Sequence, residues 1–178
     1  MKREDISGLV ELIGTEVMHL CVVEYGHLGY SSICITTSSG VSYEFAAREI
    51  QRARYEAYDL SFRKVNAPND GRHIPFKQSI ESISLLQRDE WITVESEVPE
   101  GILGMHPYLQ EWGAVGSAPS DAEDVCTVTC GIILRSSSQS TLIFVDSNPE
   151  LVGITSEQSQ IDAFVNYATE TPLDESAT

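Results

Sequence analysis

The sequence predicts an α+β domain built from antiparallel β-hairpin units that pack with two or three helices, the last helix lying near the C-terminus. Three observations favour this fold class. Two pairs of strand-like segments are each joined by a short turn, a pattern typical of hairpins. Two other segments carry apolar residues at helical spacing. The chain of 178 residues is 42% apolar, and a chain of this length removes roughly 70% of its unfolded surface from water, enough for one core.

A short amphipathic helix is expected at each end of the chain. Near the N-terminus, Asp5 is the expected N-cap and Gly14 the expected end. The apolar face between them consists of Ile6, Leu9, Val10 and Ile13. Near the C-terminus, Thr155 and Gln158 have capping-box spacing. The apolar face that follows consists of Ile161, Phe164, Val165 and Ala168. Residues 170–178 are expected to form a frayed tail.

The first hairpin is expected to join residues 17–25 to residues 30–37. If Tyr25 pairs with Tyr30, the numbers of opposed residues sum to 55. One face of the pair is then almost wholly apolar and should point into the core. That face consists of Met18, Leu20, Val22, Ile33 and Ile35. The opposite face places Cys21 beside Cys34, with His19 and Thr36 next to them.

A third strand is expected over residues 41–45, and a helix over residues 46–60. Apolar residues recur there at helical intervals, namely Ala46, Ile50, Ala53, Ala57 and Leu60. Tyr58, Leu60 and Phe62 alternate as in a strand, which makes the boundary near residue 57 weak. We expect one domain over residues 1–178, with the stretch at 66–75, rich in Pro, Gly and Asn, as the place of any subdivision.

In the second half, residues 80–86 and 91–94 are expected to form strands on either side of a charged turn at residues 88–90. Residues 98–123 contain four Gly and three Pro and are expected to be a long loop, the kind of segment that often carries binding residues. A second hairpin is expected to join residues 125–135 to residues 141–146. Both of its faces are apolar, which is typical of central strands.

Charge is distributed very unevenly. Residues 1–88 carry 10 basic and 11 acidic side chains, whereas residues 89–178 carry Arg135 alone against 16 carboxylates. This excess repels phosphate backbones and anionic lipid, so nucleic acid and membranes are not expected as partners. A cationic protein is the favoured partner class, because complementary fields accelerate encounter. The alternative interpretation is that acidity only keeps the chain in solution.

The cysteines leave three interpretations open: small apolar packing groups, zinc ligands or a disulfide between Cys21 and Cys34. Their spacing, with Cys126 and Cys130 four residues apart, differs from that of zinc ribbons and fingers. A disulfide needs Cα atoms within roughly 7 Å and is disfavoured in a reducing compartment. We expect packing, because unbridged cysteines are among the residues most often buried.

No motif for catalysis or cofactor binding accompanies these features. His73 and His106 could act as general bases, but neither has a recognisable partner. The carboxylates near residue 121 lack the spacing of a calcium loop and are interpreted as a solvated rim. We expect neither metal nor cofactor. A cytoplasmic location is expected, since no run approaches the roughly 20 apolar residues of a membrane helix and no secretory signal is recognisable.

These observations favour a non-catalytic acidic binding protein that docks a cationic protein partner. The expected contact residues combine carboxylates with one aromatic anchor; they are Glu95, Glu97, Glu100, Glu111, Trp112, Asp121, Glu123 and Asp124. In charge and size alone, the chain resembles small acidic bacterial immunity proteins, which neutralise basic toxin domains; no motif supports this, so no residue role is carried over. The alternatives are an enzyme of unassigned class with a pocket in residues 98–123, and a structural subunit of a homo-oligomer.

Overall fold

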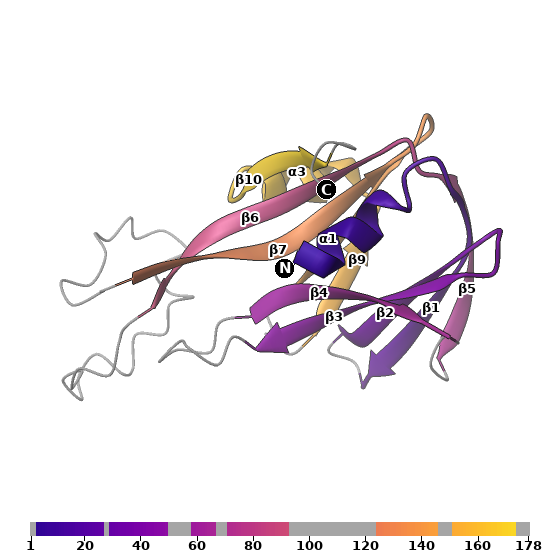
Figure 1. The fold of residues 1–178 in the computed structure, drawn as a ribbon, viewed down its shortest axis with the longest axis horizontal. Coiled ribbons are helices and arrows are strands. Elements are labelled where there is room, and N and C mark those ends of the chain that lie inside the picture. The colour runs from indigo at the N-terminus through magenta and orange to yellow at the C-terminus, as the bar shows by residue number, and fades with distance from the viewer. Residues whose placement is uncertain are drawn as a thin grey trace.

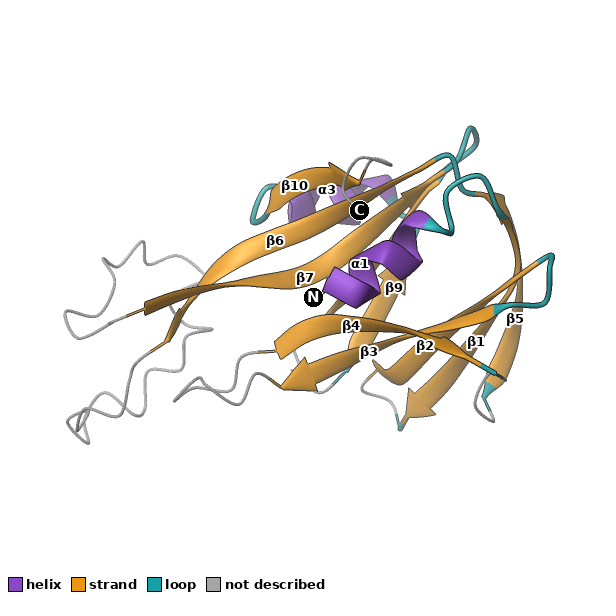
Figure 2. Ribbon diagram, in the orientation of Figure 1, coloured by secondary structure: helices purple, strands orange, loops and turns teal. Residues whose placement is uncertain are grey.

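Ten antiparallel strands form one sheet that curls into a half-barrel (Figures 1 and 2). The computed structural model describes residues 3–26, 29–49, 58–66, 71–92, 124–145 and 151–173. Within these ranges two short helices accompany the sheet. The expected α+β class is therefore wrong, because segments read as helix or turn in the sequence are strands of this sheet.

The elements follow one another along the chain in a simple order. They are α1 (Arg3–Val10), β1 (Glu16–Tyr25), β2 (Gly29–Thr37), β3 (Ser42–Glu49), β4 (Tyr58–Val65), β5 (Arg72–Ser79), β6 (Ser82–Ile92), β7 (Asp124–Arg135), β8 (Ser140–Val145), β9 (Val152–Thr155), α3 (Gln158–Val165) and β10 (Thr169–Leu173).

Neighbouring strands run in the order β10-β6-β7-β8-β9-β2-β1-β5, while β3 pairs with β2 and β4. The sheet divides at β2. Near its start, Tyr30 pairs with Val152 of β9, whereas its second half pairs with β3. The β3–β4 hairpin thus leaves the main path and faces β7 across the core. The two end strands, β5 and β10, contain Pro75 and Pro172, and proline is tolerated mainly at such edges.

The predicted register of the first hairpin is confirmed over its middle. Pairs from His19 with Thr36 to Val23 with Ser32 sum to 55, as expected, and irregularities shift the register at both ends. The expected core residues Leu20, Val22, Ile33 and Ile35 are buried in the main core. The predicted register holds because a short loop and one apolar face together determine the pairing.

The helix expected over residues 46–60 is wrong at both ends, where β3 continues to Glu49 and β4 begins at Tyr58. Residues 50–57 lie outside the described residues. Phe45 is directly opposite Phe62 in the β3–β4 ladder, and the Phe62 ring stacks on Tyr43 with 5.1 Å between centroids. These pairings between strands outweigh the helical spacing of small alanines, since strand preference depends on packing against cross-strand neighbours.

The charged turn expected at residues 88–90 is also wrong. Strand β6 runs through it without interruption, with Arg88 opposite Val128 and Asp89 opposite Thr127. Asp89 fits here because it shares an exposed face of the ribbon with Thr127, whereas Arg88 is half-buried on the opposite face. The second hairpin is confirmed, with β7 and β8 joined through a turn in which the N–H of Ser136 donates to the carbonyl of Gln139. The loop expected over residues 98–123 lies outside the described residues.

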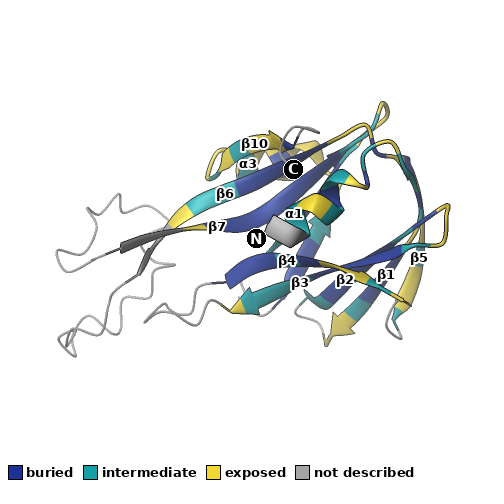
Figure 3. Ribbon diagram, in the orientation of Figure 1, coloured by how far each residue is buried: buried dark blue, intermediate teal, exposed yellow. Residues whose placement is uncertain are grey.

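Both expected terminal helices exist, and each covers a different face of the sheet. Helix α1 contributes Leu9 to the main core beside β4, and the turn after it contributes Leu12. Asp5 is inside the helix rather than its cap, and the helix ends at Val10 rather than at Gly14. Helix α3 covers the outer face of β7 and β8 with the predicted apolar face, centred on buried Ile161 (Figure 3). Neither described helix is long and apolar enough to span a bilayer.

Two details of the C-terminal segment differ from expectation. Thr155 is the last residue of β9 rather than the cap of α3, and Glu157 is the N-cap residue without a side-chain capping bond. The hydroxyl of Thr155 instead accepts a hydrogen bond from the N–H of Glu157, at 3.1 Å. Residues 169–173 are not frayed, because they form β10 against β6. The rest of the expected tail, residues 174–178, lies outside the described residues.

Candidate functional site

The expected contact residues fall almost entirely outside the described ranges. Those outside are Glu95, Glu97, Glu100, Glu111, Trp112, Asp121 and Glu123, together with the candidate base His106. Asp124 is the first residue of β7, opposite Ile92 of β6, but its side chain is not described. Their grouping therefore stays a prediction.

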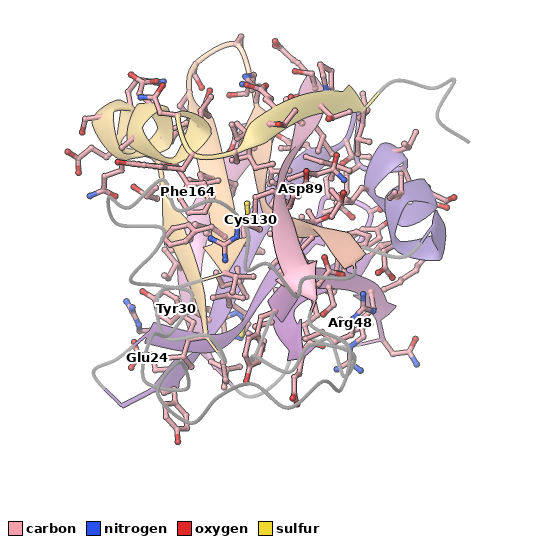
Figure 4. The ribbon with its side chains drawn as sticks, turned by 90° about the vertical axis from the view of Figure 1, so that its left-hand side faces the viewer. Glu24, Tyr30, Arg48, Asp89, Cys130 and Phe164 are labelled. Atoms are coloured by element: carbon pink, nitrogen blue, oxygen red, sulfur yellow. The ribbon has the colours of Figure 1, made fainter. Side chains whose placement is uncertain are left out.

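The strand ends that flank residues 93–123 nevertheless have a definite location. The β6–β7 ribbon extends past the end of β8, because β8 pairs only with the second half of β7, from Gly131 onward. The tips of β6 and β7 lie at the same end of the molecule as the end of β3 and the start of β4 (left in Figure 1). Figure 4 views this end and shows Asp89 and Arg48 on one side of it, with Glu24 and Tyr30 on the other.

Within the described ranges, four basic side chains of the first half pair with carboxylates of the same half. Arg48 pairs with Asp59 at 2.6 Å and with Asp5 at 3.8 Å. Arg63 pairs with Glu44. The remaining two pairs are exposed: Arg72 with Glu24 at 2.8 Å and Lys77 with Glu16 at 3.3 Å.

In the second half, the one basic residue also pairs locally, since Arg135 lies 2.7 Å from Glu170. The carboxylates of Asp89, Glu157 and Asp162 are exposed to solvent. Asp89 accepts a hydrogen bond from the hydroxyl of Thr127, and Asp162 accepts one from the Gln158 amide on the same helix. These contacts leave their negative charge in place, so the described part of this half presents net negative surface.

Among the residues whose burial is described, two carboxylates are buried, and both serve the fold. Glu44 and Asp59 are each 3% exposed and project from β3 and β4, where Arg63 and Arg48 pair with them. Asp59 also accepts a hydrogen bond from the backbone N–H of Thr129 on β7 at 2.9 Å. Buried charges require such partners. The Glu44 pair connects β3 to β4, and Asp59 holds the hairpin against β7.

The pKa of Tyr43 is shifted by its surroundings. Its hydroxyl, in a residue that is 5% exposed, donates to a carboxylate oxygen of Glu11 at 3.5 Å. Burial, together with the negative charge of Glu11 and this hydrogen bond, raises the pKa of Tyr43 above its ordinary value. The contact attaches the turn after α1 to β3.

The three cysteines whose side chains are described occupy two separate places. Cys21 and Cys34 are buried thiols directly opposite each other on β1 and β2. Cys130 is buried under α3, and its thiol donates to the carbonyl of Leu86 at 3.3 Å. Within the ranges described above, no three His, Cys, Asp or Glu side chains converge to hold a metal ion. His73 is opposite Cys21 in the register but is exposed on β5.

Sequence reasoning missed Tyr167 as a surface feature. It is 77% exposed and lies in the turn just after the end of α3. The helical spacing of these residues already indicates the exposure of Tyr167. It follows Phe164 by three residues but falls outside the apolar stripe centred on Ile161. Exposed aromatic residues are enriched at protein contacts, so Tyr167 is a surface feature that the sequence analysis did not single out.

Comparison with known proteins adds no relative: no family model, curated protein or solved structure matches this chain.

Proposed function

We propose that this protein is a non-catalytic binding protein whose acidic C-terminal half docks a cationic protein surface, in the manner of an immunity-type inhibitor. One observation carries the proposal. Arg48, Arg63, Arg72 and Lys77 pair with carboxylates from residues 5–59, so these cations do not neutralise the second half. That half has 16 carboxylates and one basic residue.

A charge excess of this kind acts mainly on the rate and selectivity of encounter. Complementary fields raise association rates and disfavour partners of like charge. At physiological ionic strength the field decays over roughly 8 Å, so binding must weaken as salt rises. We place the encounter in the cytoplasm.

The test begins with the tagged protein, recovered from its own cells at low ionic strength, and with mass spectrometry of what accompanies it. Each candidate is then purified and titrated against the protein over a range of salt concentrations. We expect a partner of high isoelectric point whose affinity falls steeply with salt. Replacing three expected contacts together, Asp121→Asn, Glu123→Gln and Asp124→Asn, should weaken binding about tenfold or more.

A matched control changes the same amount of charge elsewhere. Glu81→Gln, Glu157→Gln and Asp162→Asn together remove three exposed carboxylates that are not among the expected contacts. This variant should bind within about threefold of the unaltered protein, because distant charges are screened. A partner that binds equally at all salt concentrations, or equal losses in the two triple variants, would contradict the proposal.

A further inference from the structure

We propose that Cys21 and Cys34 form a thiol–disulfide site, in which oxidation links β1 to β2 across the middle of the first hairpin. The site is defined by register. The two residues are directly opposed in the antiparallel ladder, between the pairs Leu20 with Ile35 and Val22 with Ile33.

Direct opposition satisfies the distance requirement of a disulfide. Opposed Cα atoms in antiparallel strands lie about 4.5 or 5.5 Å apart, according to the type of pair, and disulfides accept Cα separations of about 4.4 to 6.8 Å. Opposed side chains also leave the sheet on the same face. Cys21 and Cys34 are 2% and 1% exposed, so both sulfurs lie in the same buried environment.

The edge strand controls access to this site. Strand β5 is the last strand of the sheet and pairs with β1. Just before it, the backbone of Gly71 lies against Cys21: a Cβ built on Gly71 would lie 2.9 Å from the Cys21 sulfur and 2.6 Å from the Val22 carbonyl oxygen. Detachment of β5 therefore exposes Cys21 first, whereas Cys34 lies one strand further in, between β1 and β3.

The chemistry is thiol–disulfide exchange with oxidised glutathione, a small-molecule disulfide. The Cys21 thiolate attacks one sulfur of that disulfide, whose S–S bond breaks and releases one glutathione thiolate. The Cys34 thiolate then attacks the Cys21 sulfur, forms the protein S–S bond and releases the second glutathione. The protein thiols lose two electrons, oxidised glutathione gains them, and the two cysteine protons end on the two released thiolates.

The experiment equilibrates the native full-length protein with a series of oxidised to reduced glutathione ratios, then quenches with acid, alkylates and maps peptides by mass spectrometry. We expect the Cys21 and Cys34 peptides to be linked. We also expect the equilibrium constant for linkage to be on the order of 100-fold higher in native buffer than in urea, for a closed loop of this length.

Variants separate this site from the other thiols and from general unfolding. Cys130→Ser, which removes a buried thiol elsewhere, should leave the link intact, and Cys34→Ser should abolish it. Gly71→Ala should speed oxidation several-fold, because its Cβ has no room unless β5 moves. The proposal is overturned if both thiols stay unlinked in native protein at ratios that oxidise the urea-unfolded chain, or if another cysteine pair forms instead. The mapping of the unaltered protein decides this even if a variant does not fold.

Discussion

The carboxylate of Asp59 on β4 accepts a hydrogen bond from the backbone N–H of Thr129 on β7, across 70 residues of sequence. The first half of β7 extends past the end of its neighbour β8, so its backbone has no β8 ladder there. At Thr129, the Asp59 side chain from the opposite layer accepts the hydrogen bond that a neighbouring strand would otherwise accept. The half-barrel is thus held together at this point by one buried ionic hydrogen bond.

Asp59→Ala should lower the free energy of unfolding by about 2 to 3 kcal/mol, because the N–H of Thr129 loses a charged acceptor and Arg48 loses a close partner. The loss stays below that of a fully buried pair, since the Arg48 side chain is 35% exposed. Urea denaturation followed by circular dichroism measures it. Asp89→Ala is the matched control: Asp89 is also bonded to a β7 threonine but is exposed, so its loss should stay within about 0.5 kcal/mol. Equal losses would contradict this reading.

Gly153→Ala should destabilise the chain by about 1 to 3 kcal/mol through overpacking. A Cβ at this position would lie 2.4 Å from the ring of Phe144, and that ring is held by Phe164 of α3, with 5.1 Å between centroids. Combining the change with Phe144→Leu, which removes the obstructing ring atoms, should cost less than the sum of the two single changes. Additive losses in urea denaturation would show that the two residues do not conflict.

The raised pKa of Tyr43 predicts a loss of stability at alkaline pH. The folded state holds this proton more tightly than the unfolded chain, so its contribution is fully present below the ordinary tyrosine pKa of about 10. It is lost as pH rises through the higher folded-state pKa. Urea midpoints compared below and above pH 10 should therefore fall less for Tyr43→Phe than for the unaltered protein. Tyr25→Phe, which removes the hydroxyl of a 57% exposed tyrosine, should follow the unaltered protein.

Packing of α3 can be tested by the contrast between Ile161 and Tyr167. Ile161 is 2% exposed in the smaller core under the helix, whereas Tyr167 is 77% exposed. Ile161→Ala should cost about 2 to 4 kcal/mol, and Tyr167→Ala should change the free energy of unfolding by no more than about 0.5 kcal/mol. A comparable cost for the tyrosine would mean that it packs against the protein rather than facing solvent.

The features that the sequence predicted correctly are local. The first hairpin has a short connection and one apolar face, so pairing Cys21 with Cys34 followed from residues close in the chain. The apolar face of α3 likewise repeats within two turns. In both cases the pattern that predicts the structure lies within about 20 residues, and side-chain periodicity is enough to recognise it.

The incorrect expectations involve contacts between distant segments. Nothing near residue 46 indicates that Phe45 will face Phe62, and the charges at 88–90 resemble a turn until β7 is known to pair with them. The same limit applies to Asp59, whose acceptor role depends on Thr129. The carboxylates of residues 95–123 could be predicted as a charge excess but not as a surface, because their arrangement depends on a segment with no periodic pattern.

The prolines of β5 and β10, the two end strands of the main path, restrict how copies of this chain can associate. A proline has no N–H to offer to an added strand, so neither Pro75 nor Pro172 can take part in a continuous ladder with a neighbouring molecule. Growth into ribbons or fibrils by edge-on stacking is thereby discouraged at both ends of the eight-strand path. At these two edges, association must instead use side chains, where it can be weakened by salt or by single substitutions.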